Sequence, residues 1–572
     1  MKKLINRPED VVREMIEGVV ALSPSTAILA GENVVVRAGL AEPASRPVAI
    51  ISGGGSGHEP AHAGYVGPGM LTAAVAGEVF TSPSADAVYA AIRAAAGPAG
   101  AVLIVKNYTG DRLNFGMAAE MARASGIPVE IIVVADDVAL RDTVTEDRRR
   151  GIAGTVLVHK IAGAAAAIGL PLAEVVAVAN SAASRVSSMG ISLGSCTLPS
   201  VGKPGFTLGE HEIEVGLGIH GEPGVRRMDI APADKLVAIV VDAILADGRT
   251  KSGDDAVILI NGLGSTPPLE LAILARAGMA KLRAEGVNVV RAWAGTFLSA
   301  LDMPGFSISV LPVSRDDLAL LDHPVDTLAW PGGGKVNRSP AVVETGNSFS
   351  PATVSEAGSI GNAAAGHLRE IFARIADALT EAEPELARLD GVSGDGDLGA
   401  SMRRGADALR AIPNVSFSTA STALSDAADR IRKAIAGSSG PFYATALMRA
   451  ARRLQGIADP TAIDIADAFS DAVQAVMDLG GAKPGDRTMV DALHPMSRTF
   501  ATQVAAGIPA EIAWRSAVDA GAEGMRLTSS MHPRLGRASY LGERAIGNPD
   551  AGAVAVVIWL RAVSGSATRD AD

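Results

Sequence analysis

Three aspartates stand close together in the segment LDGVSGDGDLG, residues 389–399. Asp390, Asp395 and Asp397 offer carboxylate oxygens, the ligands that Mg²⁺ takes in proteins while keeping room for water and substrate phosphates. The glycines beside Asp395 permit a tight backbone path and the close approach of a phosphate. A short run of Asp and Gly is more commonly an ordinary turn. Because a helical run follows directly and further phosphate-friendly loops lie downstream, metal-assisted phosphoryl transfer is our first hypothesis.

A glycine-rich loop follows the predicted strand Val48–Ser52 and has the sequence GGGSGHEP, residues 53–60. Open α/β sheets bind ligands at the carboxyl ends of their strands. The loop is not a Walker A motif, because no Gly-Lys-Ser/Thr closes it. A tight strand-to-helix turn accounts for the glycines at least as well, but His58 near the end of the loop favours a ligand site.

Two more polar side chains follow the predicted strand Ala101–Val105, in the sequence KNYTGD. Lys106 and Asp111 should emerge at the same edge of the sheet as His58. A Lys and an Asp in this position often form a solvated ion pair or a helix N-cap, and for Asp111 alone we favour the cap. The convergence of two polar strand ends on one edge favours a binding site.

His220 lies among glycines in the sequence GLGIHGEPG, residues 216–224. In such a loop, its ring has few core residues to pack against and is free to approach a ligand. A neutral imidazole is a competent nucleophile towards a carbonyl at neutral pH. Five other histidines have no context that suggests a function: His62, His159, His323, His367 and His532.

Length and composition limit the classes of protein to consider. A chain of 572 residues is too long for one core, so two or more domains are expected. The net charge of −11 argues against a nucleic-acid partner, which needs clustered Lys and Arg. A single cysteine, Cys196, excludes a disulfide framework and suits a reducing cytosol. With no visible signal peptide and no long apolar run, we expect a cytoplasmic protein that does not enter a membrane.

The first part of the chain has the alternating pattern of an α/β fold. Short β-branched runs predict strands, those of the first set buried and parallel, and a helix is expected over Gly116–Ser125. The first set of strands is Val48–Ser52, Ala101–Val105 and Val129–Val134. The second set has strands Ala256–Ile260, Val287–Ala292 and Phe306–Val313, with helices Leu236–Ala246 and Pro268–Ala284. We therefore expect one α/β domain over residues 1–330, built from two α/β subdomains.

The character of the sequence changes after Trp330. Residues 331–351 are rich in Gly, Pro, Ser and Asn without periodicity, which predicts a linker. From residue 352 the chain is Ala-rich and apolar at helical spacing, so residues 352–572 are expected to form an all-α domain of seven or eight helices. The segment Ala553–Leu560 is the one candidate strand there.

Six of these motifs together resemble the dihydroxyacetone kinase family. GGGSGHEP, KNYTGD and GLGIHGEPG resemble its substrate domain, and LDGVSGDGDLG, KPGDRTMVDAL and GRASYLGERAIG resemble its nucleotide domain. The resemblance covers essentially the whole chain, with the motifs in the same order. It implies a ketose-binding domain followed by an all-α helical barrel that binds ATP. Fusion of the two domains in one chain goes, in this family, with ATP as the phosphate donor.

The resemblance also assigns roles to residues of the first domain. His220 matches the histidine that binds a ketone carbonyl as a hemiaminal, which would explain selectivity for short ketoses and aldehydes over polyols such as glycerol. His58 and Asp111 match the pair that handles the proton of the hydroxyl being phosphorylated, with Asp111 as the general base. The remaining positions of the substrate pocket are Gly55, Ser56, Gly57 and Lys106.

In the second domain, the resemblance implies that Asp390, Asp395 and Asp397 hold Mg²⁺ ions that bridge the ATP phosphates. The matching nucleotide positions are Leu398, Ser401, Ser438, Ser439, Gly480, Met489, Arg537 and Asp550. Two departures from the family pattern lie at or beside these positions: Leu398 stands where many relatives carry a polar residue, and Ala551, after Asp550, replaces a proline. A third change, Ser438 in place of a threonine, keeps the hydroxyl.

Several alternatives stay open from the sequence. The sugar could be dihydroxyacetone, glyceraldehyde or erythrulose, because each offers a carbonyl to His220. The protein could also be a lyase that cyclises FAD, which would need the carboxylates but not His220. A catalytically silent ketose-binding regulator is disfavoured by the intact set Asp390, Asp395, Asp397 and Asp111. The resemblance further implies a homodimer, and it leaves open which subunit's nucleotide domain serves each substrate domain.

Overall fold

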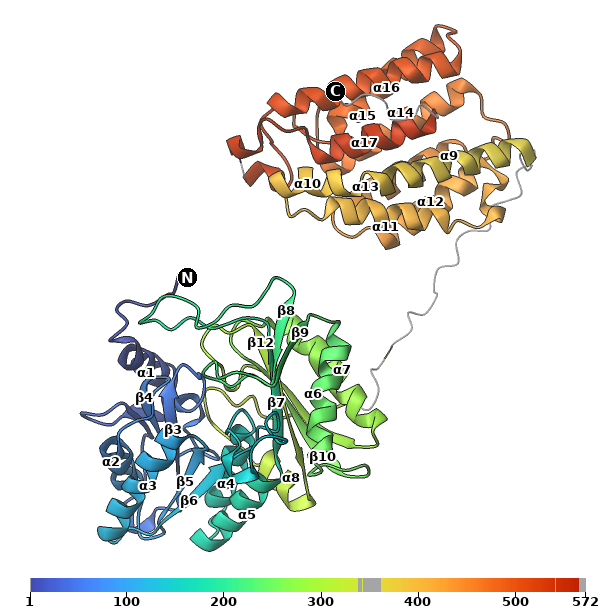
Figure 1. Ribbon diagram of the computed structural model, residues 1–572. Coiled ribbons are helices and arrows are strands. Elements are labelled where there is room, and N and C mark those ends of the chain that lie inside the picture. The colour runs from blue at the N-terminus through green and yellow to red at the C-terminus, as the bar shows by residue number, and fades with distance from the viewer. Residues whose placement is uncertain (1, 338–341, 343–361, 541, 565–572) are drawn as a thin grey trace. The chain divides into compact units, whose positions relative to one another are not determined.

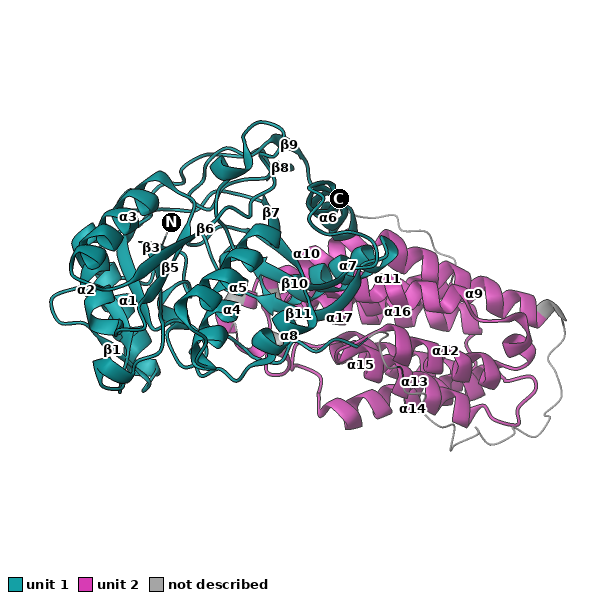
Figure 2. Cartoon of the chain, turned by 90° about the horizontal axis from the view of Figure 1, so that it is seen from below, with its two compact units in different colours: residues 1–343 teal, residues 344–572 magenta. Residues whose placement is uncertain are grey.

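The chain divides into two units, residues 1–343 and 344–572 (Figures 1 and 2). The computed structural model describes residues 2–337, 342, 362–540 and 542–564, so most of the predicted linker 331–351 lies outside the described residues. Strands and helices alternate in the first unit, whereas the described part of the second unit contains only helices. The expected fold class, an α/β region followed by an all-α region, is confirmed.

The first unit begins with a six-stranded mixed sheet of order β1-β2-β4-β3-β5-β6. The central strands β3 and β5 pair in parallel, are completely buried and consist largely of Ile, Val, Ala and Gly, as expected for a sheet covered on both faces. The strands are β1 Thr26–Ile28, β2 Val34–Arg37, β3 Ala49–Ser56, β4 Ala73–Val79, β5 Ala101–Lys106 and β6 Val129–Val134.

Helices cover both faces of this sheet. Because successive side chains of a strand point to opposite faces, Ile50 packs in one core and Ile51 in the other. The first core takes side chains from α1 Val11–Leu22, α4 Thr155–Ala167 and α5 Leu172–Arg185. The second takes side chains from α2 Ala85–Ala95 and α3 Thr109–Ala124. The predicted helix Gly116–Ser125 is therefore the second half of a longer helix that begins at Thr109.

A second six-stranded sheet has the order β11-β10-β12-β7-β8-β9. Its strands are β7 Ser187–Ser192, β8 Glu212–Val215, β9 Arg226–Asp229, β10 Asp255–Gly262, β11 Asn288–Gly295 and β12 Gly305–Pro312. Helices α6 Ala233–Ala246 and α7 Pro268–Ala284 pack on one face, and α8 Arg315–Asp322 follows β12. Val257 and Leu259 on the other face belong to the same core as Ile50 of the first sheet, so the two sheets share one hydrophobic core.

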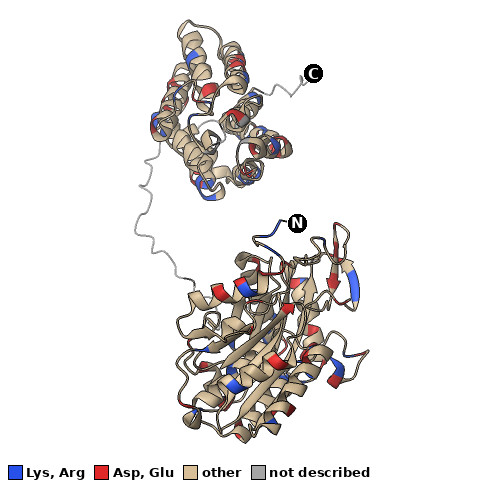
Figure 3. Cartoon of the chain, turned by 90° about the vertical axis from the view of Figure 1, so that its left-hand side faces the viewer, with Lys and Arg blue, Asp and Glu red and all other residues tan. Residues whose placement is uncertain are grey.

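The described part of the second unit contains nine α-helices, one or two more than expected. They are α9 Asn362–Glu381, α10 Glu383–Ser393, α11 Leu398–Arg410, α12 Ala420–Ala434, α13 Ser439–Arg453, α14 Ala462–Gly480, α15 Val490–Ala505, α16 Ala510–Leu527 and α17 Ala551–Val563. Short 3₁₀ helices connect some of them: η4 Asn414–Ser418, η5 Thr528–Ser530, η6 Arg537–Tyr540 and η7 Gly542–Ala545. Within each unit, Lys and Arg are interspersed with Asp and Glu (Figure 3).

The candidate strand Ala553–Leu560 is wrong, because this segment lies within helix α17. Its apolar residues have no clear period since the helix packs against both cores of the helical unit. Ala555 belongs to one core of the helical unit, whereas Ala553 and Val556 belong to the other. The carboxylate of Asp550 accepts a hydrogen bond from the backbone N–H of Ala553 at 2.9 Å and thereby caps the helix.

The helices of the second unit surround an apolar cavity of about 760 Å³, with Phe372, Leu424, Phe469 and Trp514 among the lining residues. Among the described residues, no helix is both long enough and apolar enough to cross a membrane.

Candidate active site

The glycine loop, residues 53–60, begins within β3, because Gly53 to Ser56 are strand rather than the predicted turn. At Gly55 and Gly57 the chain has no room for a side chain. A β-carbon on Gly55 would lie 2.5 Å from the backbone nitrogen of Thr81. Gly57 has a φ of +100°, and a β-carbon there would lie 2.9 Å from the ring of Phe80. Only glycine satisfies both demands. The loop therefore packs tightly against the segment after β4 and delivers His58 into the interior.

His58 is fully buried and is held through its Nδ1 atom. This Nδ1–H donates a hydrogen bond to the carbonyl oxygen of Ser299 at 2.8 Å, and the ring stacks on Phe80 with centroids 5.1 Å apart. Burial holds the pKa of His58 well below its usual range, and the charge of Lys106 adds to this effect. The Nε2 atom of a neutral His58 is thus left to face the site.

His220 lies in the loop between β8 and β9, with its Nε2 3.0 Å from Nε2 of His58. Glu222 binds the residue twice: Oε1 accepts from Nδ1 at 2.9 Å, and Oε2 accepts from the backbone N–H at 3.0 Å. Burial acts to raise the pKa of Glu222, but the hydrogen bond and charge of His220 bring it down to about 2. The rings of Tyr108 and Phe80 pack edge-on against His220, with centroids 4.7 and 5.1 Å away.

These contacts fix the number of protons on the two imidazoles. The Ser299 carbonyl and the ionised Glu222 carboxylate can only accept, so each Nδ1 atom must carry a proton. The hydrogen bond between the two Nε2 atoms then requires one further proton.

Lys106 and Asp111 lie beside the same loop. Lys106 ends β5 and is fully buried, and its Nζ has no hydrogen-bond partner in the described part of the chain. Burial lowers the pKa of Lys106, although the charge of Asp111 opposes this. A β-carbon on Gly54 would lie 3.1 Å from Nζ of Lys106 and 3.4 Å from Oδ2 of Asp111, so both groups face the glycine loop.

Asp111 does not cap a helix, because Tyr108 is the residue that precedes α3. Asp111 stands in the first turn of α3, is 3% exposed, and its Oδ1 accepts a hydrogen bond from Ser82 Oγ at 2.5 Å.

Ser56 differs from the other predicted pocket residues, since its hydroxyl donates to the Gly77 carbonyl at 2.7 Å and so anchors the loop to β4.

Sequence reasoning missed five residues that surround this site: Phe80, Ser82, Tyr108, Glu222 and Ser299. Tyr108 and Glu222 stand inside motifs already singled out, so attention to the polar neighbours of His220 and Asp111 could have found them. Ser299 lies 241 residues from His58, its hydrogen-bond partner, and nothing local to either residue signals that contact.

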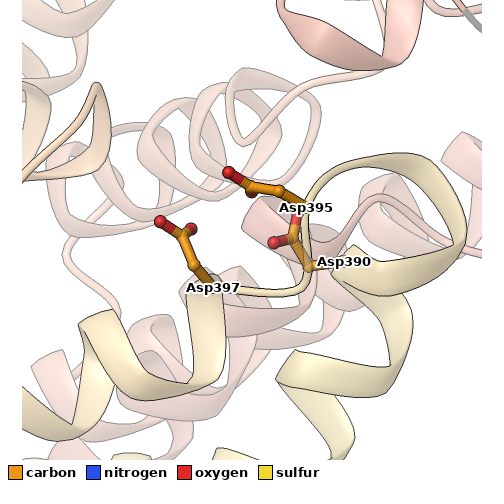
Figure 4. Close-up of side chains that lie close together, drawn as sticks. All are labelled: Asp390, Asp395 and Asp397. Carbon is orange, nitrogen blue, oxygen red and sulfur yellow. The ribbon is translucent and has the colours of Figure 1, made fainter. Parts of the chain in front are cut away.

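The three aspartates of the second unit do come together. One carboxylate oxygen of each of Asp390, Asp395 and Asp397 lies within 4.8 Å of those of the other two (Figure 4). Asp390 stands in the last turn of α10, and Asp395 and Asp397 follow between α10 and α11. Asp390 is half-buried and its Oδ2 accepts a hydrogen bond from the backbone N–H of Leu398 at 3.2 Å, whereas Asp395 and Asp397 are exposed. Oxygen donors on a short, partly open loop fit Mg²⁺, a hard cation that keeps several waters.

Most of the expected nucleotide residues lie at helix ends. Leu398 and Ser401 stand in the first turn of α11, Ser438 and Ser439 at the start of α13, and Met489 and Asp550 directly before α15 and α17. Helix N-termini present free N–H groups and favour anions such as phosphates. Gly480 ends α14, and Arg537 begins η6, where its side chain lies outside what the structure describes.

Some of these helix ends are neighbours in space. A β-carbon on Gly552 would lie 3.1 Å from Oδ1 of Asp550 and 3.7 Å from Cβ of Met489. Similarly, a β-carbon on Gly480 would lie 2.9 Å from the ring of Phe442, one turn along α13 from Ser438. Burial raises the pKa of Asp550 to about 6, against the lowering effect of the Ala553 N–H and of Arg487.

Both units match known domain families. The Dak1 domain matches residues 17–329 and the DAK2 domain matches residues 392–565. The triokinase/FMN cyclase of Homo sapiens is 39% identical over 572 residues, which cover 98% of this chain and 98% of that protein. The D-erythrulose kinase of Mycolicibacterium smegmatis is 37% identical over 577 residues and 99% of each chain.

Among solved structures, the dihydroxyacetone kinase from C. freundii in complex with AMP-PNP and Mg²⁺ is similar over 99% of this chain and 100% of that chain, with a TM-score of 0.63 and 35% sequence identity. These relatives match over their full length, so they contain both units in the same order. The similarity does not rest on one shared domain. The chain therefore belongs to the dihydroxyacetone kinase family, in the form that joins a Dak1 domain and a DAK2 domain in one polypeptide.

Proposed function

We propose that the protein transfers a phosphoryl group from Mg-ATP to a terminal hydroxyl of a short ketose or aldose, namely dihydroxyacetone, glyceraldehyde or erythrulose. The observation that carries this proposal is the pair of imidazoles, the buried His58 and the partly exposed His220, with Nε2 atoms 3.0 Å apart. The pair lies beside the unpartnered ammonium of Lys106 and the carboxylate of Asp111. The similarity to a triokinase/FMN cyclase and to a D-erythrulose kinase supports the substrate class.

We propose that His220 captures the sugar through Nε2. The Nε2 lone pair bonds to the carbonyl carbon, the π electrons move to the oxygen, and the proton held between the two Nε2 atoms passes through His58 to that oxygen. The product is a hemiaminal hydroxyl, a neutral His58 and a cationic His220 ring. Tethering turns the later phosphoryl transfer into a nearly unimolecular step, and it selects against glycerol, which has no carbonyl.

Asp111 would then act as the general base towards the terminal hydroxyl, assisted by His58. Its Oδ1 is occupied by Ser82, which leaves Oδ2 on the side of the glycine loop for the substrate proton. Lys106 would donate to a sugar oxygen, because a buried ammonium without a hydrogen-bond partner is unfavourable until a ligand supplies one. Gly55, Ser56 and Gly57 would bring the backbone close to the sugar.

In the second unit, Asp390, Asp395 and Asp397 would hold Mg²⁺, which neutralises charge on the transferring phosphate. The residues that would line the nucleotide are Leu398, Ser401, Ser438, Ser439, Gly480, Met489, Arg537 and Asp550. The N-terminal turns of α11 and α13 would offer backbone N–H groups to the phosphates. We propose residues 1–330 and 352–572 as the two functional domains, and a homodimer, which light scattering on the full chain would test.

The decisive experiment measures ATP consumption with Mg²⁺ against dihydroxyacetone, glyceraldehyde, D- and L-erythrulose, and glycerol. The wild type and His220→Ala are compared in parallel. We expect turnover with at least one carbonyl sugar, little with glycerol, and a collapse of activity in the variant. Absence of turnover with every sugar would overturn the proposal.

FAD cyclisation is the second candidate, favoured by the full-length similarity to a triokinase/FMN cyclase and by the clustered carboxylates. It would need the metal site but not the covalent histidine. FAD cleavage that survives in His220→Ala but is lost in Asp390→Asn would establish it. If neither kinase nor cyclase activity is found while dihydroxyacetone still binds, the protein is a ketose-binding regulator.

A further inference from the structure

We propose that Glu222 is the residue that positions His220 for capture of the sugar. It holds the ring proton on Nδ1, so that Nε2 is the atom that attacks, and it balances the positive charge that the ring keeps in the covalent adduct. This inference rests on the proposed function, because it concerns the step in which His220 bonds to the sugar. It adds a role for a residue that does not itself touch the substrate.

Glu222 uses both of its carboxylate oxygens on the same residue. Oε1 accepts from the ring Nδ1 of His220 at 2.9 Å, and Oε2 accepts from the backbone N–H of His220 at 3.0 Å. Two contacts to one residue fix both the plane of the ring and its distance from the backbone. A carboxylate on one ring nitrogen determines the tautomer and leaves the other nitrogen for chemistry.

Glu222 also balances the charge that the capture step leaves on the ring. When Nε2 of His220 bonds to the carbonyl carbon and the oxygen takes its proton through His58, the His220 ring still carries its Nδ1 proton. The ring is then an imidazolium, while His58 is neutral. Glu222 is the carboxylate in hydrogen-bond contact with that ring. In the adduct, the His220 imidazolium and the Glu222 carboxylate therefore form an ion pair.

Gly218 leaves the space that this carboxylate occupies. A β-carbon on Gly218 would lie 2.1 Å from Oε2 of Glu222 and 2.7 Å from Nη1 of Arg150. Arg150 is fixed by Asp137 at 2.7 Å and by the Gly216 carbonyl at 2.7 Å, so it cannot give way easily. The more freely rotating Glu222 side chain would have to move instead. The absence of a side chain at Gly218 therefore lets Glu222 reach His220.

This geometry supplies two independent variants. Glu222→Gln keeps the size of the side chain but removes the charge and can present an amide N–H to Nδ1, which stabilises the wrong tautomer. Gly218→Ala keeps every functional group and displaces the carboxylate by contact. Gly209→Ala is the matched control, because Gly209 lies in the loop that precedes β8 and the nearest atom to its β-carbon would be 3.6 Å away.

The measurement is the ¹³C spectrum of [2-¹³C]dihydroxyacetone bound to the full chain without ATP. Hemiaminal formation moves the labelled carbon from the carbonyl range to the range of a tetrahedral carbon, so the ratio of the two signals gives the covalent fraction. We expect an adduct in the wild type and in Gly209→Ala. Glu222→Gln and Gly218→Ala should still bind the sugar but lose at least tenfold in the ratio of covalent to free-carbonyl sugar, whereas Glu222→Asp should recover part of it.

Equal covalent fractions in the wild type and in both variants would overturn the role of Glu222. So would a loss of adduct that appears only together with a lowered melting temperature, since Glu222 would then hold the loop rather than the imidazole. If the wild type itself forms no adduct, the covalent role of His220 fails, and that failure is distinct because it appears before any variant is compared.

Discussion

Ser82 Oγ lies 2.5 Å from Oδ1 of Asp111 and leaves Oδ2 of the carboxylate facing the glycine loop. A hydroxyl that donates to one carboxylate oxygen holds the other in a fixed direction. Hydrogen bonds to charged groups contribute about 1.5–3 kcal/mol. We therefore expect Ser82→Ala to lower kcat for the preferred sugar by about tenfold to a hundredfold, with a smaller change in KM.

The control for this variant lies two residues further along the chain. Ser84 caps α2 through a hydrogen bond from the Ala87 backbone N–H, so Ser84→Ala should cost about 1 kcal/mol of stability and leave kcat unchanged. Steady-state kinetics and thermal unfolding of both variants separate the two effects. Equal kcat values for Ser82→Ala and the wild type would mean that Asp111 is oriented by other contacts.

The magnesium site offers a similar pair of variants. A β-carbon on Gly394 would lie 2.5 Å from Oδ1 of Asp390, so Gly394→Ala should turn this carboxylate away from Asp395 and Asp397. We expect the increase in ATP affinity that Mg²⁺ produces to be at least tenfold smaller than in the wild type. Calorimetric titration with ATP at several Mg²⁺ concentrations measures this increase.

Gly391→Ala is the control, because no atom lies within 4 Å of the place that its β-carbon would take, and alanine favours the helix that contains it. Its Mg²⁺ dependence should match that of the wild type. If the two alanine variants bind Mg-ATP equally well, the conformation of Asp390 is not what holds the metal.

Local sequence was sufficient for the parts of the sites that lie within one loop. Asp390, Asp395 and Asp397 fall within eight residues, and their clustering follows from a single turn between two helices. Of the strands around the glycine loop, β3, β5 and β6 were predicted, because short β-branched runs bounded by glycines are typical of buried strands. The strand β4, which pairs with Gly53–Ser56, was missed because its sequence AAVAGEV is rich in Ala and Gly and has no β-branched run.

What could not be predicted depends on tertiary contacts or on burial. The partner of His58 Nδ1 is a backbone carbonyl at Ser299, which any residue type could supply. The error at α17 has a physical cause, since a segment that packs against two cores loses the polar positions that distinguish a helix from a strand. Glu222 was missed for a different reason: its own side chain is unremarkable until the ring of His220 is placed against it.

Buried neutral histidines should make the first unit sensitive to acid. Burial, reinforced by the charge of Lys106, lowers the pKa of His159 to about 3, and the pKa values of His58 and His62 also lie well below the usual range. Below the ordinary pKa of 6.5 the unfolded chain binds protons that the folded chain does not. For His159, stability is therefore lost as pH falls from 6.5 towards 3, by about 1.4 kcal/mol per pH unit. His58 and His62 act in the same direction.

His159→Gln tests this expectation, because an amide can replace the hydrogen bond between His159 Nε2 and Ser52 Oγ, 3.1 Å apart, without titrating. The free energy of opening of β5, from hydrogen exchange corrected for the intrinsic effect of pH, should fall less steeply with acid in the variant, by about 1.4 kcal/mol per pH unit. Parallel slopes in the two proteins would show that His159 titrates normally in the fold.

Arg487 should hold together the part of the helical unit that carries the nucleotide residues. It is 1% exposed, and its guanidinium donates to the backbone carbonyls of Thr528, Ala545 and Asn548 at 3.1, 2.6 and 3.0 Å. These carbonyls belong to the segment between α16 and α17, which ends at Asp550. Arg487→Met would leave three carbonyls without this donor, so we expect a loss of about 3–5 kcal/mol in the unfolding free energy of the helical unit.

The same variant should weaken Mg-ATP binding, because the segment that precedes Asp550 loses its anchor while the three metal-site aspartates are untouched. Hydrogen exchange in α15 reports the stability, and calorimetry on the full chain reports the affinity. Arg526→Met is the control: Arg526 forms an exposed ion pair with Glu523, so its removal should change stability by no more than about 0.5 kcal/mol. Similar exchange rates in the two variants would contradict the role of Arg487 in stability. Normal stability with weakened nucleotide binding would mean that Arg487 supports the nucleotide site rather than the fold.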